Sequence, residues 1–289
     1  MSESDQPNPA DVFRVVADET RMTILRALAE APYDEYEEVL TFSQLRERAG
    51  IRDSGKFNYH LDTLVGQFVE RTDEGYSLTY PGELLYRTIV AGLFTRETEL
   101  EPRDIDSDCL DCGTSLEMSY DEAVLRITCP ECEREYMTVE FPPSAVESRD
   151  ADADRLETFD QWVRHHVMLM NRDVCVWCAG RMPGELRYRS EEDRIPYVAH
   201  TCEHCGGFMW TTPGETVLNH PAVVSFFYER GVDVTSRPLW ELPFVVSDDA
   251  VEVRSEDPWD LAVTVACEGD EMRVLLDGDA KVVGIEGKE

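Results

Sequence analysis

Residues 109–132 read CLDCGTSLEMSYDEAVLRITCPEC, and residues 175–205 contain a second arrangement of the same kind. Each stretch holds two Cys-x-x-Cys pairs, so the chain carries two complete cysteine quartets. Four thiolates suit a soft, tetrahedral cation, and zinc is the default metal for such a set. The spacing therefore predicts two zinc sites, with the ligands Cys109, Cys112, Cys129, Cys132, Cys175, Cys178, Cys202 and Cys205.

The distance between the pairs favours zinc-ribbon-like modules. Residues 113–128 separate the pairs of the first quartet, which is ordinary ribbon spacing, and residues 179–201 separate those of the second, which is a longer hairpin. Because the cysteines fill all four positions around the ion, we expect both sites to be structural rather than catalytic. The alternative is four pairs of buried or redox thiols, but the strand-to-helix setting of a thioredoxin-type pair is missing.

Three residues near or beyond the second quartet need an interpretation of their own. His200 and His204 flank the last pair, and either could replace a cysteine as a ligand. We expect both to face solvent instead. Cys267, the one cysteine outside the quartets, lies in an apparent strand and is expected to be a small buried residue.

Hydrophobic periodicity predicts helices at the N-terminal end of the chain. Residues 11–30 show helical spacing, and Asp18 or Thr20 is a candidate cap for a second helix within them. Further helices are expected at 42–49, from Asp53-Ser54 to about 67, and at 81–95. Two β-compatible runs, 68–72 and 76–79, flank an acidic turn that contains glycine and predict a hairpin. This order is that of a helix-turn-helix followed by a wing.

The rest of the chain is expected to alternate between small modules and a helix. Residues 142–154 suggest a linker, 154–170 an amphipathic helix, and 218–230 another helix, while short strands are expected from Phe244 onward. The fold class is therefore predicted as α+β with a β-rich C-terminus. The expected domains are a winged helix-turn-helix at 10–95, ribbon modules at 103–141 and 173–212, a connecting helix at 152–172 and an α/β region at 213–289.

The amino-acid composition says more about the salt concentration in which the protein works than about the molecule that it binds. The chain has 27 Lys and Arg against 60 Asp and Glu, a net charge of −33, and only three of the cations are lysines. Taken alone, this charge argues against nucleic acid, because DNA-binding proteins normally carry a basic surface. Few lysines with many acidic residues also resemble the bias of extreme halophiles, which keeps proteins soluble in molar salt. At 42% hydrophobic residues, the chain can form packed cores.

No targeting segment is apparent. No apolar run approaches the length of a membrane span, and Met1 to Ala10 lack the basic and apolar parts of a signal peptide. We expect a cytoplasmic protein without membrane contact, in which the cysteines stay reduced.

Two segments carry a resemblance to a known family. Residues 17–28, ADETRMTILRAL, resemble the early-helix motif of ArsR-type winged-helix regulators, and residues 54–64, SGKFNYHLDTL, resemble their recognition helix. The resemblance covers about residues 10–95. It implies that residues 54–60 enter the major groove of double-stranded DNA and that the wing meets the backbone. The implied DNA-binding residues are Ser54, Lys56, Asn58, Tyr59, His60 and Arg71.

The resemblance leaves some points open. His60 and Tyr59 could instead pack against the hydrophobic face of their helix. Residues 41–47 contain no cysteine, so the metal-sensing box of some family members is missing and metal sensing is not carried over. Family members commonly dimerise through their first and last helices, which implies a homodimer through residues 11–16 and 83–95.

We compare three classes of function with these observations. A sequence-specific transcriptional regulator accounts for most of the features. A zinc-ribbon scaffold that docks on proteins of the transcription machinery is the alternative, since ribbons commonly bind protein partners. An enzyme is not expected, because we find no phosphate-binding loop, no nucleophile motif and no open metal site.

Overall fold

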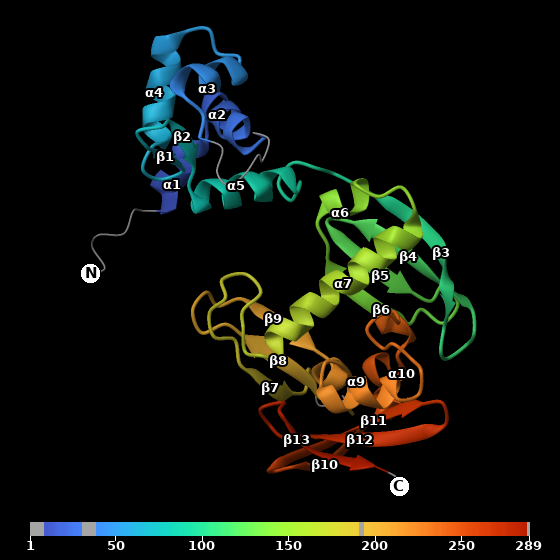
Figure 1. Ribbon diagram of the computed structural model, residues 1–289. Coiled ribbons are helices and arrows are strands. Elements are labelled where there is room, and N and C mark those ends of the chain that lie inside the picture. The colour runs from blue at the N-terminus through green and yellow to red at the C-terminus, as the bar shows by residue number, and fades with distance from the viewer. Residues whose placement is uncertain (1–8, 31–38, 191–193, 288–289) are drawn as a thin grey trace. The chain divides into compact units, whose positions relative to one another are not determined.

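The computed structural model describes residues 9–30, 39–190 and 194–287. The chain divides into two compact units, of which the first ends at Arg96 and the second begins at Glu97. Helices and antiparallel sheets are mixed and the C-terminal region is rich in strands, which confirms the predicted α+β class (Figure 1). Among the described helices, none is long and apolar enough to cross a membrane.

The described part of the first unit consists of helices and a small antiparallel hairpin. In chain order these are α1 (Pro9–Val16), α2 (Glu19–Ala29), α3 (Phe42–Arg48), α4 (Ser54–Leu64), β1 (Val69–Arg71), β2 (Tyr76–Leu78) and α5 (Tyr80–Val90).

Polar caps decide where helices of this unit begin. The side chain of Asp18 accepts a hydrogen bond from the Arg21 amide at 3.1 Å and starts α2. Asp53 does the same for the Lys56 amide at 2.9 Å and starts α4. Each cap satisfies an amide that has no partner inside its helix, which is why the predicted starts near these residues are confirmed.

The apolar sides of α2, α3 and α4 meet in one core. Ile24, Leu45 and Phe57 are completely buried there. The first turn of α5 packs directly against the chain before the hairpin, because a Cβ at Gly82 would lie 2.1 Å from the Phe68 carbonyl oxygen. Only glycine permits this close approach.

The second unit contains three antiparallel sheets and several helices. Before α7 the elements are β3 (Leu100–Asp108), β4 (Ser115–Asp121), β5 (Val124–Thr128), β6 (Glu135–Glu140) and α6 (Pro143–Glu147). They are followed by α7 (Asp152–Met170), β7 (Gly184–Arg187), β8 (Tyr197–Thr201), β9 (Phe208–Thr211), α8 (Pro213–Leu218), α9 (Pro221–Tyr228) and α10 (Pro243–Val246). The last sheet is formed by β10 (Val251–Glu256), β11 (Trp259–Cys267), β12 (Asp270–Leu276) and β13 (Val282–Gly287).

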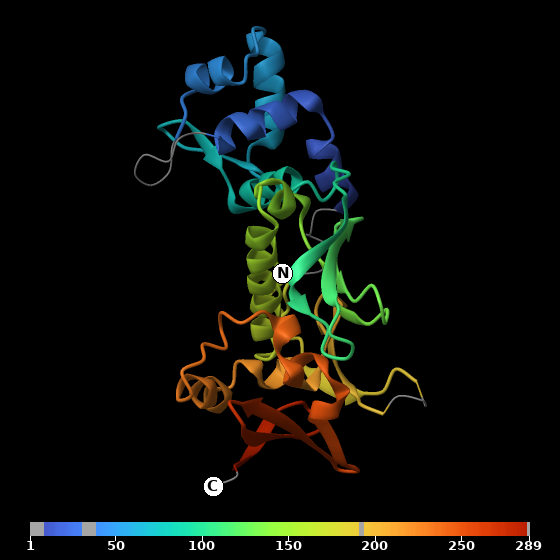
Figure 2. The same ribbon diagram turned by 90° about the vertical axis from the view of Figure 1, so that its right-hand side faces the viewer.

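A single hydrophobic core runs through the second unit. Figures 1 and 2 show α7 passing along the β3–β6 sheet towards the β7–β9 sheet, with α9 and α10 over the β10–β13 sheet. Phe159, Val163 and Val167 of α7 are buried in the same core as side chains from all three sheets. The predicted amphipathic helix at 154–170 is thus confirmed, although it starts two residues earlier.

A buried ion pair on α7 holds an irregular part of the chain. Arg164 Nε lies 2.6 Å from Asp160 Oδ2, and both side chains are almost fully buried. The other carboxylate oxygen accepts a hydrogen bond from the Leu239 amide at 2.8 Å, and Arg164 also donates to the Arg237 carbonyl. Burial raises the pKa of Asp160, while the adjacent guanidinium lowers it. Removing one partner alone would leave an uncompensated buried charge.

Three secondary-structure predictions are wrong in part. The expected linker at 142–154 contains α6, whose Val146 is buried in the core. The helix expected at 218–230 is α9, which begins only at Pro221 and ends at Tyr228, and Leu218 is instead the last residue of α8, a helix that the sequence did not predict. Phe244 lies in α10 rather than in a strand, and the last sheet begins only at Val251.

Glu215 predicts how stability depends on pH. Its side chain closes a capping box with Thr212 at the start of α8, and burial raises its pKa from 4.5 to about 7. The folded chain thus keeps this proton up to about pH 7, whereas the unfolded chain loses it near pH 4.5, so stability falls as pH rises between these values. We expect Glu215→Gln, which can form the same cap, to remove this slope and to gain up to about 3 kcal/mol at pH 8.

Denaturant unfolding at several pH values in molar potassium chloride measures this effect. The exposed Glu271 on β12 is the matched control, and Glu271→Gln should keep the slope of the parent chain. An unchanged slope in Glu215→Gln would contradict the assignment.

Candidate metal centres and nucleic-acid interface

The structure brings each cysteine quartet together. In both groups the four sulfur atoms lie within 4.8 Å of one another. The Sγ atoms of Cys109 and Cys132 are 3.6 Å apart, and those of Cys178 and Cys202 are also 3.6 Å apart. A tetrahedral ion with metal–sulfur bonds near 2.3 Å requires sulfur–sulfur distances of about 3.8 Å. Both groups therefore fit a four-coordinate metal ion.

All four Cys-x-x-Cys pairs have the same backbone. The residue directly after each pair has a positive φ, and its amide donates to the carbonyl of the first cysteine at 2.9 to 3.0 Å. The amide of that first cysteine donates in turn to the carbonyl of the residue two places after the pair, at 2.8 to 2.9 Å. The four residues with positive φ are Gly113, Glu133, Ala179 and Gly206.

This repeated geometry is costly at two of the four positions. Glycine adopts a positive φ freely, but Glu133 and Ala179 carry a Cβ and are strained there by about 1–3 kcal/mol each. The strained conformation persists here because it allows the amides of Glu133 and Ala179 to donate to the carbonyl of the first cysteine of their pair. A strand follows every pair, namely β4, β6, β7 and β9, so no pair opens a helix as a thioredoxin-type redox pair would.

Hydrogen bonds prepare one sulfur of each quartet as a thiolate. Burial raises the pKa of Cys109, but the Tyr136 hydroxyl, 3.3 Å from its sulfur, and two backbone amides outweigh this effect and lower it to about 6. For Cys202, the backbone amides of Cys205 and His204 lower the pKa to about 6. Backbone amides lower the pKa of Cys132 and of Cys178, but hydrogen bonds with neighbouring cysteine sulfurs and burial outweigh this effect and raise it to about 12. Binding of a metal would displace the protons that these two sulfurs keep, because the thiolate is the form that binds metal.

Tyr136 is a part of the first cluster that the sequence did not reveal. Its oxygen also accepts a hydrogen bond from the Leu110 amide at 2.7 Å, and the guanidinium of Arg134 lies 4.9 Å from its ring. Outer contacts of this kind orient metal ligands. Tyr136 is one of many aromatic residues in the sequence and matches no motif, so only the fold identifies its role.

The residues beside the second cluster differ from each other. His204 is exposed, as predicted. The prediction that His200 faces solvent is wrong, because this residue is buried on β8 and its Nε2 lies 3.0 Å from the Thr211 hydroxyl. Burial lowers the pKa of His200 to about 4, so the ring is neutral at physiological pH. Cys267 is buried in β11, as expected.

The six residues expected to contact DNA lie on α4 and on the hairpin. Ser54, Lys56, Asn58 and Tyr59 are exposed on α4, and Arg71 is exposed on β1. His60 is the exception, since it is only 9% exposed.

His60 faces the interior, which is the alternative that the sequence left open. Its Nδ1 lies 3.3 Å from Asp18, the cap of α2, and its ring is in edge contact with Tyr59. The position of His60 thus links α4 to the start of α2. Of the two rings, only that of Tyr59 can reach a ligand, since 66% of its surface is exposed.

Comparison with known families separates the two units. Residues 106–282, which make up more than half of the chain, match the model described as Domain of unknown function (DUF7351). The chain belongs to this family. Residues 9–89 are similar to a second model, Domain of unknown function (DUF7347). Both cysteine quartets lie in the DUF7351 segment, whereas α4 and the hairpin lie in the DUF7347 segment. None of the curated proteins matches the chain.

The two clusters predict the metal content of the chain. Elemental analysis of the purified protein should find two metal ions per chain, one for each quartet. Cys129→Ala should lose one of them, because it removes a buried ligand of the first cluster. Cys267→Ala is the matched control and should keep both, since this buried cysteine belongs to neither cluster. Less than one metal ion in the unaltered chain would refute the assignment.

Proposed function

We propose that this protein is a DNA-binding transcriptional regulator, in which a winged helix-turn-helix reads operator DNA and two structural zinc ribbons stabilise the rest of the chain. The observation that carries the proposal is the outer face of α4. It presents Lys56, Asn58 and Tyr59 to solvent, and the hairpin that follows α4 presents Arg71. Lysine and asparagine can read base edges, while arginine on a wing suits the phosphate backbone.

The order of elements supports the same proposal. The helices α3 and α4, followed by the β1–β2 hairpin, have the order of a winged helix-turn-helix, and residues 17–28 and 54–64 resemble ArsR-type regulators. In this arrangement α4 is the recognition helix. The His60–Asp18 contact would then fix the helix that reads DNA, without itself touching a base.

The distribution of charge makes this face compatible with DNA. Within residues 51–72, Arg52, Lys56 and Arg71 balance Asp53, Asp62 and Glu70, so that the −33 lies elsewhere in the chain. In the halophilic setting that the composition favours, molar salt shortens the Debye length to about 3 Å and screens repulsion from the acidic body. Counterion release is weak there, so recognition would depend on short-range hydrogen bonds and shape.

Zinc is the metal that we assign to both clusters. A set of four cysteines suits a cation that prefers sulfur and tetrahedral coordination, and zinc is the most common one. The residues that would hold it are the eight cysteines of the two quartets, and all are used as ligands, which leaves no open position for a substrate. Zinc would stabilise the fold and cross-link the hairpins.

Exposed apolar residues on α1, on α5 and directly after α5 support a homodimer. Phe13 is 69% exposed, Leu84 54% and Phe94 73%. These positions belong to the first and last helical segments of the unit, through which the resembling family dimerises. A dimer would place two copies of α4 on the two halves of a palindromic operator.

Genome-wide occupancy of the tagged protein tests DNA binding. We expect discrete sites for the unaltered chain and loss of most of them for Lys56→Gln combined with Asn58→Ala, because both substitutions remove groups that face the groove. Arg26→Gln is the control, since it changes an exposed cation of the same unit on α2. If neither the full chain nor these variants occupied specific sites, and no duplex were bound in molar potassium chloride, the proposal would be wrong.

Analytical ultracentrifugation in molar potassium chloride tests the dimer. We expect Phe94→Ser to shift the full chain from dimer to monomer, because a large exposed apolar side chain would be lost from the contact. Tyr228→Ser is the control, since Tyr228 is 79% exposed but lies on α9 in the second unit. A monomeric parent chain, or equal dissociation by both substitutions, would refute this contact.

A second candidate function is a scaffold that binds proteins of the transcription machinery. Trp177, in the first pair of the second quartet, is 53% exposed, and Phe208 at the start of β9 is 50% exposed. Large exposed apolar groups of this kind mark interaction surfaces. Stable complexes with protein partners that Trp177→Ala abolishes, in the absence of any occupied DNA site, would favour the scaffold over the regulator.

A further inference from the structure

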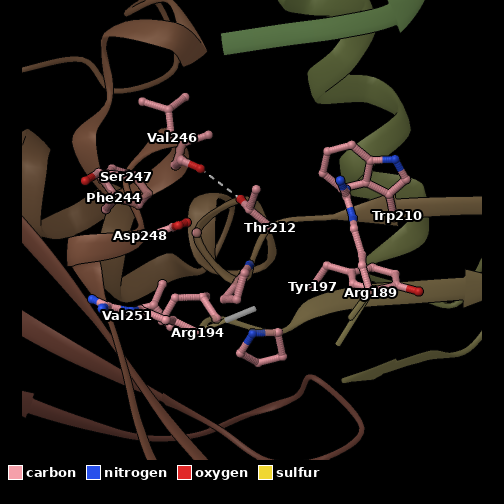
Figure 3. Close-up of a pocket in the computed structure, with 15 residues that line it drawn as sticks. Arg189, Arg194, Tyr197, Trp210, Thr212, Phe244, Val246, Ser247, Asp248 and Val251 are labelled. Carbon is pink, nitrogen blue, oxygen red and sulfur yellow. Dashed lines mark hydrogen bonds between the residues drawn. The ribbon is translucent and has the colours of Figure 1, made fainter. Parts of the chain in front are cut away.

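A pocket of about 280 Å³ lies in the second unit, outside both cysteine clusters. Its lining comes from the segment before β8, the junction of β9 with α8, and the chain from α10 to the start of β10. Figure 3 shows Arg189, Tyr197 and Trp210 together on one side of it, with Phe244, Val246 and Ser247 on the opposite side.

Arginine and aromatic rings meet on one side of the pocket. The guanidinium of Arg189 lies 4.0 Å from the centroid of the Trp210 ring and 5.3 Å from that of Tyr197. Such stacking orients a planar cation and keeps its charge close to an aromatic surface. Trp210 is still 45% exposed, so part of its ring remains accessible.

A second arginine, Arg194, belongs to the lining of the pocket. Arg194 lines the pocket, is exposed, and forms neither a hydrogen bond nor an ion pair with any residue that the structure describes. Among the residues lining the pocket, Asp248 is the one carboxylate, against two arginines. The lining is thus richer in arginine than the chain as a whole, which has a net charge of −33.

The opposite wall is held rigidly in place. The Thr212 hydroxyl donates to the Val245 carbonyl at 2.9 Å and joins the start of α8 to α10. Gly214 packs directly against α10, because a Cβ at this position would lie 1.7 Å from the Phe244 carbonyl oxygen. Since these contacts are made by the chain alone, the pocket exists before any ligand binds.

We propose that this pocket binds a small organic anion with a flat ring, of the class of aryl carboxylates. The ring would lie in the pocket beside Trp210, and the carboxylate would accept hydrogen bonds from Arg194. The size agrees, since a cavity of about 150 Å³ holds benzene and this pocket is nearly twice as large. In molar salt the attraction between charges is screened, so apolar contact and short-range hydrogen bonds would supply the affinity.

Isothermal titration of the full chain in molar potassium chloride tests the proposal, with phenylacetate and indole-3-acetate as probes. We expect one probe molecule to bind per chain. Arg194→Gln should weaken binding about tenfold, the loss typical of a hydrogen bond to a charged group. The neutral amides of the two probes should bind more weakly by a similar factor.

Arg187→Gln is the matched control. Arg187 lies on the neighbouring strand β7 and pairs with Glu185, but it does not line the pocket, so affinity should not change. Equal binding of the amides, equal loss with both arginine variants, or no binding of either carboxylate would overturn the proposal. So would binding of a dT oligonucleotide in place of the carboxylates, since Trp210 would then stack on bases. The carboxylate titrations contain no DNA, so their failure is distinct from failure of operator binding.

Discussion

The second unit depends on the burial of one side of α7. This helix contributes Phe159 and its apolar neighbours to a core shared by three sheets that form no common sheet with one another. Its polar groups connect to the same surroundings. Trp162 donates to the Glu140 carbonyl on β6, and Asn171 at the end of the helix donates to two carbonyls of α8. Without α7, the β3–β6 sheet would lose the helix that packs against it, whereas α8, α9 and α10 also cover the last sheet.

The cysteine pairs add a second, more local constraint. Each quartet joins two turns that are separated along the chain by a full hairpin, and each turn has the same pattern of two backbone hydrogen bonds. This arrangement brings the sulfur atoms to the distance that a tetrahedral metal requires. Because small sheets such as β7–β9 bury little surface, a metal cross-link would be a large part of their stability.

The charged contacts of the molecule differ in how deeply they are buried. Most ion pairs among the described residues have at least one partner that is well exposed to solvent, and such pairs contribute little, all the more so in concentrated salt. The Asp160–Arg164 pair is different, because both groups are buried and the carboxylate also binds a backbone amide. Arginine suits this site, since its planar group can donate to a carboxylate and a carbonyl at once. Salt therefore screens this contact much less than the surface pairs.

The sequence by itself determined the α+β class, the cysteine quartets and the starts of α2 and α4, because periodicity, Cys-x-x-Cys spacing and caps are local signals. The sequence did not predict α8 or place Phe244 in a helix, since short apolar runs are compatible with either structure. Only the tertiary structure decided that His60 and His200 are buried and that the Tyr136 hydroxyl donates a hydrogen bond to Cys109. It also decided that Arg189 and Arg194 line the same pocket as Trp210. These properties depend on residues far apart in the chain, and no local pattern records which side chains the fold will bring together.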